Sequence, residues 1–91
     1  MIDGTVKDQV EQTIKNVEAI LSAANSGLER ILKVTIYIPD ISLWPEINEA
    51  YAGLMGAHKP ARAVIPCGNL HYDALLEMEV IAATYEERTI T

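Results

Sequence analysis

The sequence predicts an α+β fold in which two helices pack on one face of a three-stranded sheet, in the order helix, strand, helix, strand, strand. Two patterns predict this class. Apolar residues recur every three or four positions in residues 5–24 and again after Pro45, which is typical of helices with one buried face. Residues 31–38 and 75–85 instead alternate at a period of two, as strands do, and residues 61–67 form a further run of strand length.

The first helix is predicted for residues 5–24. Thr5, with Asp8 three positions later, resembles a capping box that begins this helix. Gly27 is expected to end it, because glycine adopts the left-handed conformation after a last helical turn without steric cost. The apolar stripe of the helix consists of Val6, Val10, Ile14, Val17 and Leu21.

The segment 31–38 is predicted as the next strand. Alternation places Lys33, Thr35 and Tyr37 on one face of it. The opposite, apolar face is expected to carry Leu32, Val34, Ile36 and Ile38.

A second helix should follow the turn at Pro39. Asp40 or Ser42 is a suitable cap, and Pro45 is tolerated because it falls in the first turn. Gly56 is the expected end. The buried stripe is predicted to consist of Ile47, Ala50, Tyr51 and Leu54.

The last two strands carry charged side chains where a buried strand would be apolar. Alternation in residues 75–85 separates Leu76, Met78, Val80 and Ala82 from Glu77, Glu79 and Ile81. Arg62, in the strand before, is the nearest cation in sequence. An arginine and a carboxylate together on one sheet face would suit a small carboxylic acid and a water molecule. Since two helices cover only one face, we expect a symmetric oligomer to cover the other.

Composition narrows the possible functions. The 91 residues suffice for a single domain at 1–86, with a frayed tail at 87–91. The net charge of −6 argues against binding to nucleic-acid phosphates. A single cysteine, Cys67, gives no internal disulfide, and no metal-ligand spacing is present. Without a membrane-spanning run or a signal peptide, a cytoplasmic location is expected, or a mitochondrial one if a targeting segment precedes Met1.

Five segments, taken in order, resemble the RidA/YjgF family of enamine/imine deaminases, also called the endoribonuclease L-PSP or translation inhibitor family. The match covers almost all of the chain. The first helix and the strand and turn at 33–40 both take part. The most specific pieces are Ile47-Asn48-Glu49-Ala50-Tyr51, Pro60-Ala61-Arg62 and Leu76-Glu77-Met78-Glu79-Val80.

The resemblance implies a chorismate-mutase-like subunit that assembles as a homotrimer, with ligand clefts between neighbouring subunits. It implies hydrolysis of reactive enamines or imines, such as 2-aminoacrylate, to 2-keto acids and ammonia, with no cofactor or metal. The family's carboxylate-binding arginine maps onto Arg62, its water-activating glutamate onto Glu77, and a supporting helix asparagine onto Asn48. Met1 aligns after the family's N-terminal strand pair, so the resemblance implies an internal fragment, the product of a misplaced start, or a subunit naturally shortened at that end.

The residues themselves leave alternatives open. From the spacing alone, a structural ion pair of Arg62 with Glu77 or Glu79 is favoured over a binding role, and the resemblance reverses that preference. The protein is alternatively a non-enzymatic trimeric binder of small carboxylates or of a partner protein, or an RNA-directed inhibitor, which the acidic charge disfavours. Trp44 and Tyr51 are interpreted as packing residues.

Overall fold

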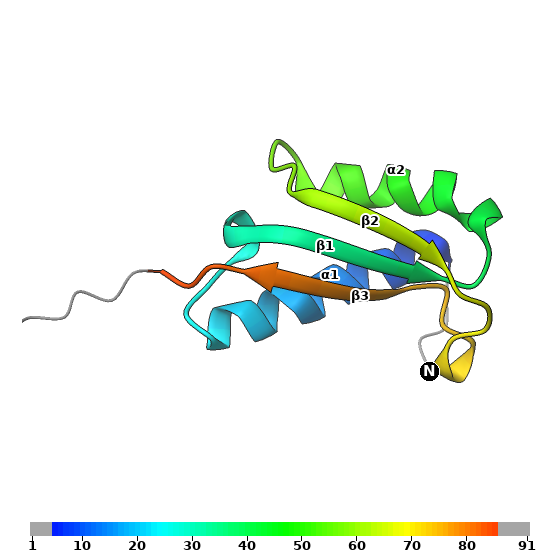
Figure 1. Cartoon of the computed structure of the whole chain (residues 1–91), viewed down its shortest axis with the longest axis horizontal. Coiled ribbons are helices and arrows are strands. Elements are labelled where there is room, and N and C mark those ends of the chain that lie inside the picture. The colour runs from blue at the N-terminus through cyan, green and yellow to red at the C-terminus, as the bar shows by residue number, and fades with distance from the viewer. Residues whose placement is uncertain (1–4, 86–91) are drawn as a thin grey trace, which may run out of the picture.

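The elements follow in the predicted order in the computed structural model, which describes residues 5–85, so the expected tail at 87–91 lies outside the described residues (Figure 1). Short 3-10 turns precede β1, α2 and β3. The helices and strands are α1 (Val6–Ala23), β1 (Ile31–Ile38), α2 (Trp44–Met55), β2 (Ala61–Pro66) and β3 (Glu77–Ala82).

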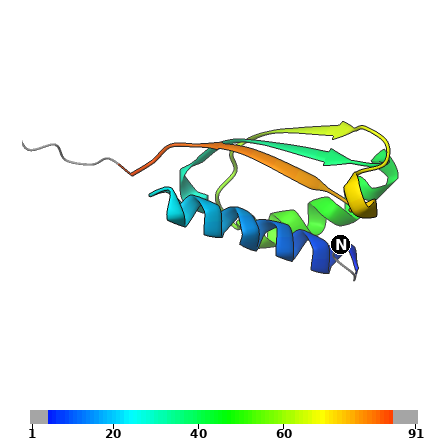
Figure 2. The ribbon, with the colours of Figure 1, turned by 90° about the horizontal axis from the view of Figure 1, so that it is seen from below.

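The strands form one mixed sheet with the order β2-β1-β3. The central strand β1 pairs with β2 in parallel and with β3 in antiparallel orientation. Both helices lie on the same side of this sheet, and Figure 2 shows the other side open. The predicted α+β architecture is therefore confirmed, and one sheet face of the described chain has no cover.

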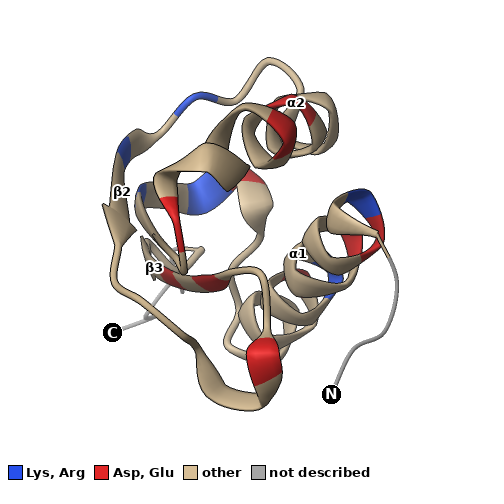
Figure 3. Cartoon of the chain, turned by 90° about the vertical axis from the view of Figure 1, so that its right-hand side faces the viewer, with Lys and Arg blue, Asp and Glu red and all other residues tan. Residues whose placement is uncertain are grey.

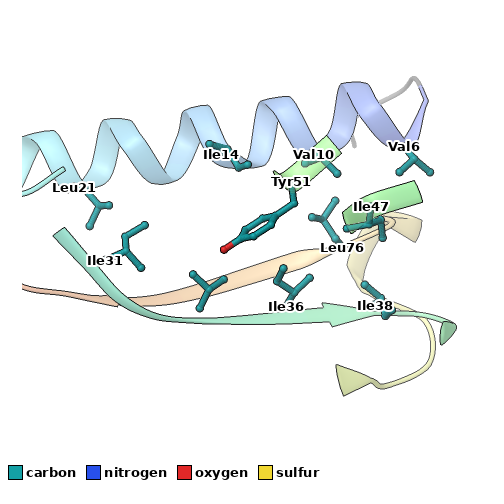
Figure 4. Close-up of a cluster of buried hydrophobic side chains, with 11 residues drawn as sticks. Val6, Val10, Ile14, Leu21, Ile31, Ile36, Ile38, Ile47, Tyr51 and Leu76 are labelled. Carbon is teal, nitrogen blue, oxygen red and sulfur yellow. The ribbon is translucent and has the colours of Figure 1, made fainter. Parts of the chain in front are cut away.

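The core lies between this sheet and the two helices (Figure 4). The predicted stripe of α1 is confirmed, since its members are buried except Val17, which packs partly buried against the core. Burying one such aliphatic side chain contributes about 1.5–3 kcal/mol, so these contacts are the main source of stability. The side chains that are completely buried are Val10, Val34, Ile36, Ile38 and Ile47.

The first helix begins as predicted but ends differently. Thr5 and Asp8 form a reciprocal capping box, each backbone N–H donating to the other side chain at 3.2 Å. The residue that takes the left-handed conformation is Asn25, at φ 59°, whereas Gly27 is extended at φ −168°. Asparagine tolerates this conformation, and the Ser26 N–H donates to the carbonyl of Leu21 at 2.8 Å, which closes the helix in a Schellman motif.

The second helix is preceded by the 3-10 turn Ile41–Leu43, which Asp40 caps by accepting the Ser42 N–H at 2.8 Å. Pro45 lies in the first turn of α2, and Gly56, at φ 62°, ends it as predicted. The expectation that Leu54 is buried is wrong. Its side chain is 42% exposed because it lies at the open groove between α1 and α2 rather than over the sheet.

Leu32 was expected in the core and is instead 61% exposed. A β-bulge between Ile31 and Lys33 shifts the register against β3. Leu32 is the extra residue of this bulge, and its side chain points outward. Ile31, which is 2% exposed, enters the core instead. The alternation along β3 is confirmed, with Glu77 and Glu79 exposed and Leu76 buried.

Candidate functional site

Arg62 is held by the second helix. It is the second residue of β2 and pairs in register with Val34 of β1, which is completely buried beneath the helices. Paired residues of neighbouring strands point to the same face, so Arg62 lies on the helix-covered face of the sheet. There its Nη1 donates a hydrogen bond to Oδ1 of Asn48 at 2.9 Å.

Two aromatic rings complete the surroundings of the guanidinium. Its Cζ lies 4.8 Å from the ring centroid of Trp44 and 5.3 Å from that of Tyr51. Each cation–π contact contributes about 0.5–1 kcal/mol at an exposed site. Trp44, Asn48 and Tyr51 follow one another at positions i, i+4 and i+7, so one face of α2 presents all three to the arginine.

The guanidinium keeps donors available for a ligand. Within residues 5–85, its hydrogen bond to Asn48 is not accompanied by an ion pair with any carboxylate. A guanidinium presents further N–H groups in a planar fork that matches a carboxylate. Arg62 is therefore oriented by its neighbours and still able to bind an anion.

A hollow of about 400 Å³ opens beside Arg62, between the C-terminal half of α2 and the linker into β2. No acidic side chain is among the described residues that line it. Figure 3 shows basic segments along this linker and β2, and acidic segments on β3. The lining residues are Asn48, Tyr51, Ala52, Met55, Gly56, His58, Lys59, Pro60 and Arg62.

Two lining groups have unusual surroundings. The Tyr51 hydroxyl is buried and has no hydrogen-bond partner in the described part of the chain. Burial raises the pKa of Tyr51, and the charge of Arg62 opposes part of that rise. Nε2 of His58 lies 2.9 Å from the carbonyl oxygen of Ile31, so this nitrogen carries the proton and donates it to the carbonyl.

Glu77 lies away from this hollow. It pairs with Tyr37 in the β1–β3 register, and Glu79 pairs with Thr35, so both carboxylates point to the open face. Both are exposed, and neither has a hydrogen bond or an ion pair among residues 5–85.

The expectation that one sheet face carries both Arg62 and Glu77 is therefore wrong for a single chain. The two residues lie on opposite faces and on outer strands separated by β1. The parallel register between β2 and β1 is the reason, because it places Arg62 beside Val34. The same geometry removes the alternative of an ion pair between Arg62 and Glu77 or Glu79 within one chain.

The sequence interpretation missed the roles of Trp44 and Tyr51 as neighbours of the arginine. Their spacing around Asn48 on one helix face was a signal that could have found them. His58, by contrast, gives no sequence signal for its bond to Ile31, because the two residues are 27 positions apart.

A family model described as Endoribonuclease L-PSP matches residues 1–84, which is nearly the whole chain. The chain belongs to the RidA/YjgF family. Protein HMF1 of Saccharomyces cerevisiae is 40% identical over 83 residues, which are 91% of this chain and 64% of HMF1. Reactive Intermediate Deaminase A, chloroplastic, of Arabidopsis thaliana is 35% identical over 81 residues, 89% of this chain and 43% of that protein.

Solved structures agree with this assignment to the RidA/YjgF family. The crystal structure of E. coli TdcF with bound serine matches at a TM-score of 0.85 and 33% identity, over 93% of this chain and 69% of TdcF. The chain thus has the YjgF subunit fold over most of its residues. It spans about two thirds of the length of HMF1 and TdcF.

Two further observations concern residues 5–85. No helix among them combines the length and apolar character that crossing a membrane requires. The same residues contain no cluster of three or more histidine, cysteine or carboxylate side chains suited to hold a metal ion.

Proposed function

We propose that this protein hydrolyses small reactive enamines or imines that carry a carboxylate, with Arg62 binding the carboxylate. The observation that carries the proposal is the Arg62 guanidinium, held by Asn48 and two rings beside a hollow and free of any carboxylate partner in residues 5–85. The similarity to a Reactive Intermediate Deaminase A and to a serine-bound protein supports this choice.

The proposed chemistry needs a positioned water and one proton shuttle. An enamine first tautomerises to the imine as a proton moves from its nitrogen to its terminal carbon. Water then adds to the imine carbon, its two protons pass in turn from oxygen to nitrogen, and the carbon–nitrogen bond breaks to leave a 2-keto acid and ammonia. Arg62 fixes the substrate through two parallel N–H···O bonds to its carboxylate, a geometry that lysine does not offer. Glu77 is the proposed base that takes the proton from water and returns it to the leaving nitrogen. No cofactor enters this scheme.

Glu77 has to come from a second copy of the chain, because within one chain it lies on the other face of the sheet. We propose a homotrimer in which the open sheet faces are covered and each cleft joins Arg62 of one subunit with Glu77 of its neighbour. The uncovered face and the absence of an ion pair for Arg62 or Glu77 in the described chain support this arrangement. A stable monomer at micromolar concentration in light scattering would contradict it.

A second candidate is a non-enzymatic protein that binds small carboxylates. The separation of Arg62 from Glu77 within one chain favours it, since the arginine site needs no second copy. Cleavage of RNA is disfavoured, because the net charge of −6 repels phosphates. The exposed free thiol of Cys67 suits a reducing compartment such as the cytoplasm for either candidate.

The test is release of ammonia from freshly generated 2-aminoacrylate. We expect Arg62→Ala to lower the rate by about tenfold or more, since it removes a charge-assisted bidentate contact. Glu77→Gln should lower it more than Glu79→Gln. Lys15→Ala, on the exposed side of α1, is the control for a lost positive charge.

Three outcomes separate the candidates. A large loss in Arg62→Ala and Glu77→Gln supports the deaminase. Equal rates for the unmodified chain and Arg62→Ala contradict it. Binding of 2-oxobutanoate that depends on Arg62, without any ammonia release, selects the non-enzymatic binder.

A further inference from the structure

The hollow beside Arg62 contains more positive charge than one carboxylate requires. Lys59 and Arg62 both line it, although the whole chain has a net charge of −6. Lys59 has no ion pair in the described part of the chain, and no carboxylate lines the space. Basic groups gathered at one point of an acidic protein attract an anion, and a concave wall of low dielectric strengthens that attraction.

We propose that this hollow binds a second anionic group of the substrate, so that imines of dicarboxylates, which derive from acidic amino acids, are preferred over monocarboxylate imines. This inference rests on the proposed function of Arg62. Arg62 binds the carboxylate next to the imine carbon, and Lys59 binds the distal carboxylate.

The size and the remaining lining groups fit such a ligand. A volume of about 400 Å³ lies within the usual range for small-molecule sites. The Tyr51 side chain also lines the hollow, although its hydroxyl is buried and points into the core (Figure 4).

His58 forms part of the wall of this subsite, and the backbone holds its ring in place. Nε2 is engaged by the Ile31 carbonyl, which leaves Nδ1 for other partners. Met55 and Pro60 supply apolar wall beside these groups.

The test compares the equilibrium binding of two stable 2-keto acids to the unmodified chain by calorimetric titration. One is 2-oxoglutarate, which has a distal carboxylate, and the other is 2-oxobutanoate, which lacks one. We expect 2-oxoglutarate to bind about fivefold more tightly, as one additional partly exposed ion pair allows. Lys59→Met should abolish this preference, Lys59→Arg should retain it, and the matched control Lys15→Met should leave it as it was.

The outcomes distinguish this inference from the proposed function. Equal affinity for the two keto acids, with 2-oxobutanoate binding that is lost in Arg62→Ala, overturns the dicarboxylate inference and leaves the proposed role of Arg62 intact. A preference for 2-oxoglutarate that survives Lys59→Met also overturns it. Failure to bind either keto acid contradicts the proposed function and this inference together.

Discussion

Arg62 of β2 donates a hydrogen bond to Asn48 of α2, a residue 14 positions earlier in the chain, at 2.9 Å. This bond therefore joins α2 to β2, the strand that follows it in the chain. Together with the rings of Trp44 and Tyr51, it decides where the guanidinium points. The orientation of the anion-binding group therefore depends on one face of α2.

Asn48→Ala tests this dependence. We expect it to weaken binding of 2-oxobutanoate severalfold, because the freed guanidinium loses its fixed orientation. The free energy of unfolding should fall by less than about 1 kcal/mol, since the hydrogen bond is exposed. Asn16→Ala is the matched control, because Asn16 accepts a similar exposed bond from Gln12 on α1. Unaltered keto acid binding in Asn48→Ala would contradict the positioning role.

Tyr51→Phe removes a buried hydroxyl that has no partner in residues 5–85. We expect the ligand-free protein to keep its stability or gain up to about 1 kcal/mol, because an unsatisfied buried polar group is unfavourable. Burial raises the pKa of Tyr51 above its ordinary 10.0. The stability that comes from keeping this hydroxyl protonated in the folded state is therefore fully present below pH 10.0, and it is lost as the pH rises through the higher folded pKa. The alkaline loss of stability should be smaller in Tyr51→Phe.

Urea unfolding between neutral and strongly alkaline pH measures both effects. A loss of more than about 1 kcal/mol at neutral pH in Tyr51→Phe would show that the hydroxyl has a stabilising partner.

Two neighbouring residues of α1 test the position of the core. Leu21 is 7% exposed and Ile20 is 69% exposed. Leu21→Ala should lower the free energy of unfolding by about 2–5 kcal/mol, because it removes buried methyl groups and leaves a cavity. Ile20→Ala should change it by less than about 1 kcal/mol. Similar losses in both variants would mean that the helix is rotated relative to the sheet.

Much of this fold could be predicted from the sequence because each element has a clear local signal. The apolar stripe of α1 and its Thr5–Asp8 capping box involve only residues within or next to that helix, so they can be read from its own sequence. Leu32 could not be placed, because the bulge that turns it outward depends on pairing with β3, whose residues lie more than 40 positions later. The left-handed residue that follows α1 is Asn25 rather than Gly27, and this choice likewise depends on a distant partner, since the Asn25 side chain donates to the carbonyl of Tyr85.

The face that carries Arg62 was the larger miss at the candidate site. Arg62 lies between Ala61 and Ala63, and two alanines give no contrast from which alternation can assign a buried side. Its face follows instead from the parallel pairing with Val34. Asn48, by contrast, is a residue to which the resemblance assigns a supporting role, and in the structure it accepts a hydrogen bond from Arg62.

Asp40 is expected to make the stability of the protein fall at acidic pH, through its cap on the turn before α2. Its carboxylate accepts the Ser42 N–H, which lowers the pKa of Asp40 below its ordinary 3.8. A lowered folded pKa means that the contribution is present above pH 3.8 and is lost as the pH falls through the lower folded value. Asp40→Asn should thus be less stable than the unmodified chain at neutral pH.

The difference between Asp40→Asn and the unmodified chain should shrink as the pH falls below 3.8, as thermal unfolding across that range would show. Glu18→Gln, at an exposed position of α1, controls for the loss of a negative charge. A difference that stays constant through this range would contradict the assignment to the Asp40 carboxylate.

The most direct test of the proposed shared site mixes two inactive variants. Arg62→Ala and Glu77→Gln are each expected to lose the release of ammonia from 2-aminoacrylate. If each site joins Arg62 of one subunit with Glu77 of its neighbour, unfolding and refolding the two variants together in equal amounts should restore about a quarter of the unmodified activity, because random assembly leaves that share of sites intact. If the mixture stays as inactive as its parts, the two residues do not meet between subunits and the account is contradicted.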